Sequence, residues 1–105
     1  MITNKLQRYL YNFDINEIEI LKSVILKAKK SFNNNHTAIY RFEDIEDELL
    51  NVIKRFKNIL IIKNKSVKSM QSYLMKSIKS ELEEKYSLDN RRKNLQTFYK
   101  NIYNS

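Results

Sequence analysis

The sequence predicts an all-α fold, a compact bundle of four or five helices with at most one short extended connector. Apolar side chains recur at intervals of three and four residues along most of the chain, which is the spacing of one helix face. Glycine and proline are both absent from the 105 residues, so the residues that build most tight hairpin turns are missing. The one β-like run, residues 58–62, cannot form a sheet alone. A chain of this length is expected to be a single helical domain spanning residues 1–105.

Two helices are expected in the first third of the chain. A short one should run from about residue 3 to about residue 12, with Leu6, Leu10 and Phe13 on one face. Asn16, followed three residues later by Glu19, fits an N-cap and its reciprocal partner, so a second helix is expected to begin there. Its buried face is predicted to hold Ile18, Leu21, Ile25, Ala28 and Phe32. The Asn run at 33–35 should end it, because Asn tolerates left-handed backbone and competes for local hydrogen bonds.

A third helix is predicted from residue 43 onward, after a segment at 37–42 that fits either an extended stretch or a helical lead-in. Its apolar face holds Ile45, Leu49, Val52, Ile53 and Phe56. Acidic residues open this helix and basic residues close it, an order that the helix dipole favours. We interpret residues 58–62, which follow, as a buried connector or as the tail of the same helix.

Ser66 is a suitable N-cap for a fourth helix. The apolar face of this helix is predicted to hold Val67, Met70, Leu74, Ile78 and Leu82. Polar residues at 87–90 interrupt the pattern, and Asp89 can cap a last helix whose inward residues are Leu95, Phe98, Tyr99 and Ile102. Together the helix faces predict a core that includes Leu21, Ile25, Leu49, Ile53, Leu74 and Ile78.

The composition excludes most catalytic and cofactor sites. Without cysteine the chain has no disulfide or thiolate metal site, which fits the cytoplasm as its location. Without glycine it lacks the loops that hold nucleotide phosphates. His36, the single histidine, has no second metal ligand or triad partner at motif spacing. We expect no enzyme activity, no cofactor and no metal, and no membrane contact, because the longest apolar run is far shorter than the ~18 residues that span a bilayer.

The formal charge of +8 is concentrated in the C-terminal part of the chain. Residues 63–105 hold ten basic and four acidic residues, whereas residues 1–62 hold ten and eight. Three lysines of this part fall on one face of the predicted fourth helix, and a basic triplet follows it. Such a surface suits phosphates, because each neutralised phosphate releases counterions; a solvated face in a lysine-rich composition is the alternative. The candidate residues for binding DNA or a partner protein are Lys68, Lys76, Lys79, Arg91, Arg92 and Lys93.

Two other groups of side chains bear on binding. Most of the seven Tyr and five Phe residues lie on apolar faces and are expected in the core. The candidates for a surface position beside basic side chains, where rings stack on unpaired bases, are Tyr73, Tyr99 and Tyr103. Acidic side chains crowd the start of the third helix, at Glu43, Asp44, Glu46, Asp47 and Glu48. The helix dipole stabilises them there without a ligand, and the alternatives are a divalent-cation site or an imitation of a nucleic-acid backbone.

From residue 42 onward the chain resembles a known family. The helix "FEDIEDELLNVIKRF", the connector with "KNKSVKS" and the helix "MQSYLMKSIKSELEEKY" are similar to the end of DnaD-like domains and to the C-terminal domains of Firmicute plasmid replication initiators. In those families the second helix carries an aromatic–leucine pair and then a second apolar pair, here Tyr73-Leu74 followed by Ile78 and Leu82. The upstream "FDINEIEILKSVI" looks like the family's opening helix, so the resemblance covers about residues 13–86.

The resemblance implies a non-catalytic interaction domain of a plasmid DNA replication initiator. Such a domain binds DNA or recruits a host replication protein such as primase or the helicase loader. It also implies that the chain is the C-terminal domain of a longer initiator, whose separate winged-helix domain binds the origin. Two alternatives stay open: a free-standing transcriptional or conjugation accessory protein of helix-turn-helix type, and an inhibitor whose acidic turn meets a basic host surface.

Overall fold

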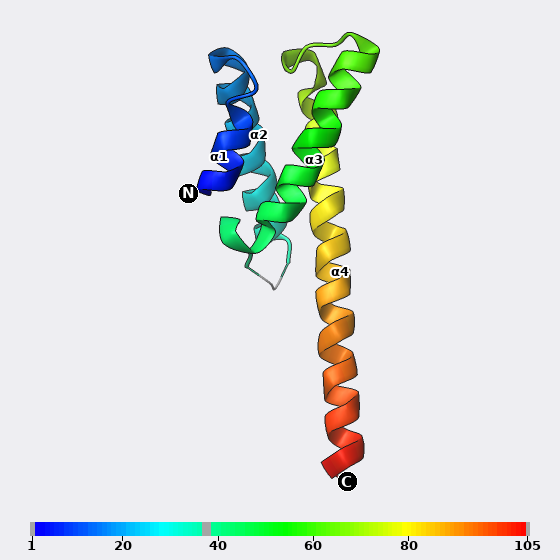
Figure 1. The fold of residues 1–105 in the computed structure, drawn as a ribbon. Helices are drawn as coiled ribbons and strands as arrows, with labels where there is room; N and C mark the ends of the chain where they lie inside the picture. The colour runs from blue at the N-terminus through cyan, green and yellow to red at the C-terminus, as the bar shows by residue number, and fades with distance from the viewer. Residues whose placement is uncertain (1, 37–38, 105) are drawn as a thin grey trace.

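The computed structural model describes residues 2–36 and 39–104, with all of their side chains except those of 98, 99 and 101–104. Over these residues the fold is all-α, as predicted, and contains no strand. Its elements are α1 (Asn4–Leu10), α2 (Ile15–Asn34), α3 (Phe42–Lys63), the short 3-10 helix η1 (Lys68–Met70) and α4 (Gln71–Asn104). Successive α-helices alternate in direction, so that α1 and α3 run one way and α2 and α4 the other (Figure 1).

Side-chain caps fix the starts of the first two helices. The Thr3 hydroxyl accepts a hydrogen bond from the Leu6 N–H at 3.4 Å, so α1 begins where it is predicted. At the start of α2 the Glu17 N–H donates to Asp14 Oδ1 at 2.9 Å, and the Asp14 N–H donates to Glu17 Oε1 at 3.1 Å. The predicted cap at Asn16 is wrong, because Asp14 is the extended residue and Asn16 already lies inside the helix.

One side chain ties the link between α2 and α3 back to α2. α2 ends within the Asn run at 33–35, as predicted, although Asn35 has φ −98° and is not left-handed. The Asn33 amide donates to the Tyr40 carbonyl at 3.0 Å and accepts from the Tyr40 N–H at 3.1 Å. Arg41 is extended, so the segment is no helical lead-in just before α3; residues 37 and 38 lie outside the described part of the chain.

Residues 58–62 are the tail of α3, and the alternative of a buried connector is wrong. Ile61 and Ile62 are 69% and 81% exposed. The helix ends at Asn64, whose backbone is left-handed at φ 51° and ψ 51°, a conformation that Asn tolerates. The hydroxyl of Ser66, which was predicted to cap the fourth helix, accepts the Ser69 N–H at 3.1 Å, but the residue that directly precedes η1 is Val67.

α4 is one continuous helix, so the predicted break at residues 87–90 is wrong. Ser, Asp and Asn lower helix stability by at most about 0.7 kcal/mol each relative to Ala, which is too little to end a helix anchored in a core. Asp89 does not cap a helix. Its carboxylate accepts a hydrogen bond from the Tyr40 hydroxyl at 2.8 Å and lies 3.7 Å from the Lys85 ammonium.

The buried apolar residues of the four α-helices form one cluster. α4 packs against α2 and α3, and α1 packs against α3. The core prediction is confirmed by six side chains that are each at most 1% exposed, Leu21, Ile25, Leu49, Ile53, Leu74 and Ile78. Each contributes about 1.5–3 kcal/mol by leaving water. In the described part of the chain, no helix has an apolar stretch that could cross a bilayer.

The second half of α4 leaves the bundle (Figure 1). The molecule measures 59 × 26 × 22 Å, and α4 accounts for about 50 Å at 1.5 Å per residue. We call residues 87–104 the α4 tail. Leu95, predicted to face inward, is 54% exposed, because the other described helices lie beside the first half of α4. The inward predictions for Phe98, Tyr99 and Ile102 fall outside the described side chains.

Candidate interaction surfaces

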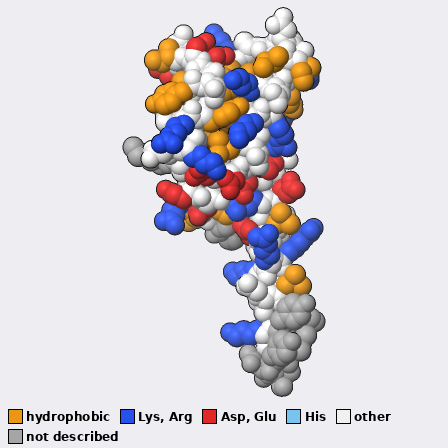
Figure 2. All heavy atoms as spheres, viewed as in Figure 1, with side chains coloured by type: hydrophobic (Ala, Val, Ile, Leu, Met, Phe, Trp, Pro, Cys, Tyr) orange, Lys and Arg blue, Asp and Glu red, His pale blue; other side chains and the backbone are white. Residues whose placement is uncertain are grey.

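The six basic residues predicted for binding lie in two groups on the structure. The first group, on η1 and the bundle half of α4, comprises Lys68, Lys76 and Lys79. The second group, on the α4 tail, comprises Arg91, Arg92 and Lys93. All are exposed except Lys79, which is half-buried. Four acidic residues lie between the two groups along α4: Glu81, Glu83 and Glu84, which we call the acidic band, and Asp89 on the tail. Figure 2 shows acidic side chains across the bundle above the basic tail.

The basic triplet of the α4 tail projects in three directions. Successive residues of a helix are about 100° apart, so the three side chains cannot share one face of a continuous α4. Lys93 returns to within about 40° of Lys79 around the helix axis. Arg92 turns toward α3, where it lines a hollow of about 170 Å³ together with Glu48 and Glu84. In the sequence no acidic residue follows Asp89, so the remainder of the tail carries only positive charge.

His36 fastens the end of α2 to α4. Its side chain is 16% exposed, stacks on Phe32 with ring centroids 3.8 Å apart, and meets the Tyr86 ring edge-on at 4.8 Å. Its Nε2 lies 2.7 Å from Glu83 Oε1, and its Nδ1 lies 2.8 Å from the Phe32 carbonyl oxygen. Both of these oxygens are acceptors, so the ring makes both hydrogen bonds when both nitrogens carry hydrogen. The contact engages Glu83 of the acidic band within the fold.

A second polar contact joins the segment before α3 to the start of the α4 tail. The Tyr40 hydroxyl donates to Asp89, and the Lys85 ammonium lies 3.4 Å from Glu48 Oε1 and 5.6 Å from the centre of the Tyr40 ring. Burial, the hydrogen bond to Asp89 and the nearby negative charges raise the pKa of the Tyr40 hydroxyl well above its ordinary value. The fold therefore holds this hydroxyl in its protonated form.

Tyr40→Phe should lower the free energy of unfolding by about 1.5–3 kcal/mol at neutral pH, because a hydrogen bond to a carboxylate is lost. The raised pKa means that the contribution of Tyr40 is complete below about pH 10 and declines as the pH rises above it. The difference between parent and variant should therefore narrow between about pH 8 and about pH 11 in urea melts. Tyr11→Phe, at a position 68% exposed, is the control and should match the parent at both pH values. A difference that widened at high pH would contradict the assignment.

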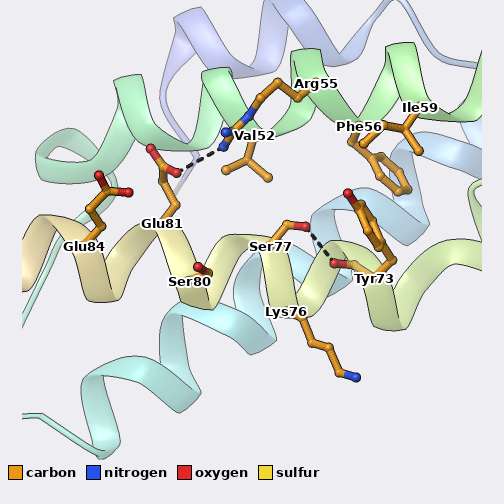
Figure 3. Close-up of a pocket in the computed structure, with 10 residues that line it drawn as sticks. All are labelled: Val52, Arg55, Phe56, Ile59, Tyr73, Lys76, Ser77, Ser80, Glu81 and Glu84. Carbon is orange, nitrogen blue, oxygen red and sulfur yellow. Dashed lines mark hydrogen bonds and ion pairs between the residues drawn. The ribbon is translucent and has the colours of Figure 1, made fainter.

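A shallow groove of about 440 Å³ lies between α3 and α4 (Figure 3). Its floor is apolar, formed by the buried side chains of Val52 and Phe56 and by the half-buried Ile59. Tyr73 lines one end, with its ring stacked on Phe56 at 6.4 Å between centroids. Tyr73 is 41% exposed, in agreement with its predicted surface position, whereas the side chains of Tyr99 and Tyr103 lie outside the described ones.

The α4 wall of the groove changes from small to acidic along the helix. Ser77 and Ser80 line its middle, where their small side chains leave the groove open. Toward the tail, Arg55 Nη2 lies 3.0 Å from Glu81 Oε2, an ion pair that links α3 to α4 (Figure 3). Glu84 follows one turn later and also lines the groove. The groove is thus apolar near one end and negatively charged toward the α4 tail.

The acidic residues that open α3 are largely paired within the fold. Asp47 lies 3.2 Å from the Lys5 ammonium, and Asp44 lies 3.9 Å from the Arg41 guanidinium. Glu48 forms the ion pair with Lys85 of α4 that is described above. Across residues 2–36 and 39–104, no group of three His, Cys, Asp or Glu side chains is arranged to hold a metal ion. These contacts favour helix stabilisation over cation binding for this turn.

Sequence reasoning did not find the groove between α3 and α4. Val52 and Phe56 fit the apolar face of α3. Periodicity alone does not show whether the neighbouring helices cover the whole of this face or leave a groove beside it. The available signal was the pair Ser77 and Ser80, because small side chains opposite an apolar helix face leave space between two helices. The six basic residues, in contrast, were chosen as binding candidates from residue type and helical spacing, and they remain a prediction.

Comparison with known proteins agrees with the resemblance described for residues 13–86. No curated protein matches the chain. The family model described as the replication initiator protein A C-terminal domain matches residues 2–84, which span α1, α2, α3, η1 and the bundle half of α4 to within two residues of its end. The α4 tail lies beyond the matched residues. The chain therefore belongs to the family of replication initiator protein A C-terminal domains.

Proposed function

We propose that this replication initiator domain works by binding other macromolecules, and that the basic side of the α4 tail contacts DNA phosphates. The observation that carries the proposal is a helix that leaves the bundle with only basic charges after Asp89. Arg92, Lys93 and Lys100 are exposed on it. A helix that projects from its bundle can approach the DNA backbone without a clash from the rest of the fold, and each phosphate it neutralises adds salt-dependent affinity. The family supplies the replication context.

The bundle group of basic residues has a secondary part in this proposal. Lys68 and Lys76 are exposed, but the acidic band lies between them and the α4 tail. Carboxylates repel phosphates, so a DNA backbone that follows the tail gains little from continuing across the band. We therefore assign the main phosphate contacts to the tail and expect the bundle group to strengthen them by long-range attraction, which salt screens.

Replacing Arg92, Lys93 and Lys100 by Ser should weaken binding to duplex DNA of any sequence, because phosphate contacts carry no sequence information. The slope of log affinity against log salt concentration should also become less steep by about 2.7, because three phosphate contacts are lost. Fluorescence anisotropy with a labelled duplex over a range of salt concentrations measures both effects. The three side chains are exposed, so thermal melts should remain close to those of the parent.

The matched control removes equal charge elsewhere. This control is the triple variant Lys27→Ser, Lys63→Ser and Lys65→Ser, whose three positions are exposed and lie away from the α4 tail. Its slope of log affinity against log salt concentration should stay close to that of the parent. Equal losses in the two triple variants would mean that binding follows net charge alone, against the proposal. A different result would assign the basic side of the α4 tail to a protein partner. In that case the parent binds an acidic replication protein but no DNA, and the tail variant no longer binds that protein. Lys76→Glu with Arg92→Glu tests the two groups together.

A further inference from the structure

The face of α4 that lines the groove continues along the α4 tail. Residues seven apart on a helix return to within about 20° of each other, and two such series run along this face. One series is Ser77, Glu84 and Arg91, and the other is Glu81, Leu88 and Leu95. Their combined spacing alternates between four and three residues, the spacing of a helix that packs lengthwise against another helix. Along this face the side chains change from small and acidic beside the bundle to apolar and basic on the tail.

The two halves of this face complement each other. Glu81 and Glu84 stand before the middle of α4, and Arg91 stands a similar distance after it. The bundle half is about 24 Å long and the tail about 27 Å, so the halves also match in length. A two-fold axis near residue 86 would bring Arg91 of one copy to Glu81 and Glu84 of another. The same axis would bring Leu95 to Ser77.

Two apolar side chains on the tail half of this face are left open to solvent in the single chain. Leu88 and Leu95 are 43% and 54% exposed on the α4 tail. Ser77, which the two-fold axis would set against Leu95, lines the groove beside Phe56 and Ile59. A leucine that enters the groove there meets apolar side chains on the α3 side and a small side chain on the α4 side. Burying it contributes about 25 cal/mol for each Å² removed from water.

We propose that two copies of this chain pair antiparallel through α4, with the α4 tail of each copy lying in the groove between α3 and α4 of the other. The charges select this direction, because parallel pairing would set Arg91 against Arg91 and Glu84 against Glu84. The same surface serves both copies, so the assembly closes as a dimer. Lys93 and Lys100 remain on the outer side of the tail, so the pairing leaves these two lysines free for phosphates, whereas Arg92 lies toward the paired side.

Sedimentation equilibrium of the whole chain tests the pairing. The parent is expected to be dimeric, and Leu95→Glu is expected to raise the dimer dissociation constant by about thirtyfold or more, because a charge would enter the apolar groove. Leu26→Glu is the matched control, since Leu26 is 50% exposed on α2, away from the proposed interface. A parent that stays monomeric at about 1 mM, or a Leu95 variant that dimerises like the parent, would overturn the proposal.

A charge exchange tests the direction of pairing. Arg91→Glu alone and Glu84→Arg alone should each weaken the dimer, because each sets like charges together across the two-fold axis. The double variant restores opposite charges between positions 84 and 91, while Glu81 stays unchanged, and should recover part of the parent's dimer affinity. A general loss of folding would not produce this recovery. Equal or additive weakening in the double variant would contradict the antiparallel arrangement.

Disulfide trapping tests the register, because the natural chain contains no cysteine. Ser77→Cys with Leu95→Cys should form a covalent dimer on mild oxidation. The two positions are about 27 Å apart on one helix, so no bond can form within a chain. Ser77→Cys alone should stay monomeric on a non-reducing gel, and its cross-linking would indicate parallel pairing and overturn the proposal. Ser77→Cys with Lys93→Cys, on opposite sides of α4, should give no covalent dimer.

Discussion

Leu74→Ala is expected to lower the free energy of unfolding by about 2–5 kcal/mol. Leu74 is fully buried where α4 packs against α2 and α3, so its removal leaves a cavity that two helices would have to close. Domains of this size have a total stability of about 5–15 kcal/mol, and the variant should be largely unfolded or close to it. Urea denaturation followed by circular dichroism measures the loss.

The control for Leu74→Ala is the same change at Leu95, which is 54% exposed on the α4 tail. That variant should retain the parent's stability to within about 0.5 kcal/mol, because an exposed side chain leaves no cavity. The comparison is made at low protein concentration, where the proposed dimer is dissociated. Full stability of the Leu74 variant would show that the bundle half of α4 does not pack as described.

Phe32→Ala should cost about 3–5 kcal/mol, as much as any single truncation in the fold. The Phe32 ring is 2% exposed and lies 3.8 Å from the His36 ring, 5.9 Å from the Tyr40 ring and 6.0 Å from the Tyr86 ring, centroid to centroid. Without this ring, His36 and Tyr40, which make the two polar contacts with α4, both lose their stacking partner. The same urea melts measure this, with Tyr11→Ala at an exposed position as the control.

The shared ring contact also predicts that Phe32→Ala and His36→Ala are not additive. Without Phe32 the His36 ring loses its stacking partner, so part of the contribution of His36 is already gone in the Phe32 variant. The double variant should therefore lose less stability than the two single variants together. Strict additivity would show that His36 reaches Glu83 without support from Phe32.

Helical periodicity was sufficient to find the core, because a buried face repeats along the chain whatever its neighbours are. Leu49, Ile53, Leu74 and Ile78 were identified in this way. The same rule failed at Leu95, since its spacing fits a helix face but no periodicity tells whether another helix is present to cover it. Exposure of the α4 tail is a property of the arrangement of helices, which one segment does not encode.

Helix ends were harder to place than helix faces. Asp14 and Asn16 both precede a Glu by three residues, so two capping boxes fit the sequence, and the earlier one is used. Ser, Asp and Asn at 87–90 suggest a break because they suit caps and turns, but without Gly or Pro the small propensity costs are offset by the anchored first half of α4. The basic candidate residues were chosen by residue type, and the structure places them in two groups with the acidic band between them.

The continuity of α4 makes the α4 tail a lever arm. Neither Gly nor Pro lies between the bundle and the end of the helix, so no residue there is suited to act as a hinge. A tilt of about 10° where the tail leaves the bundle displaces its far end by about 5 Å, given a length of about 27 Å. That tilt pulls directly on Asp89 and, one and a half turns back, on Glu83, the α4 partners of Tyr40 and His36. A force that tilts the tail is therefore transmitted through these two contacts to the segment between α2 and α3.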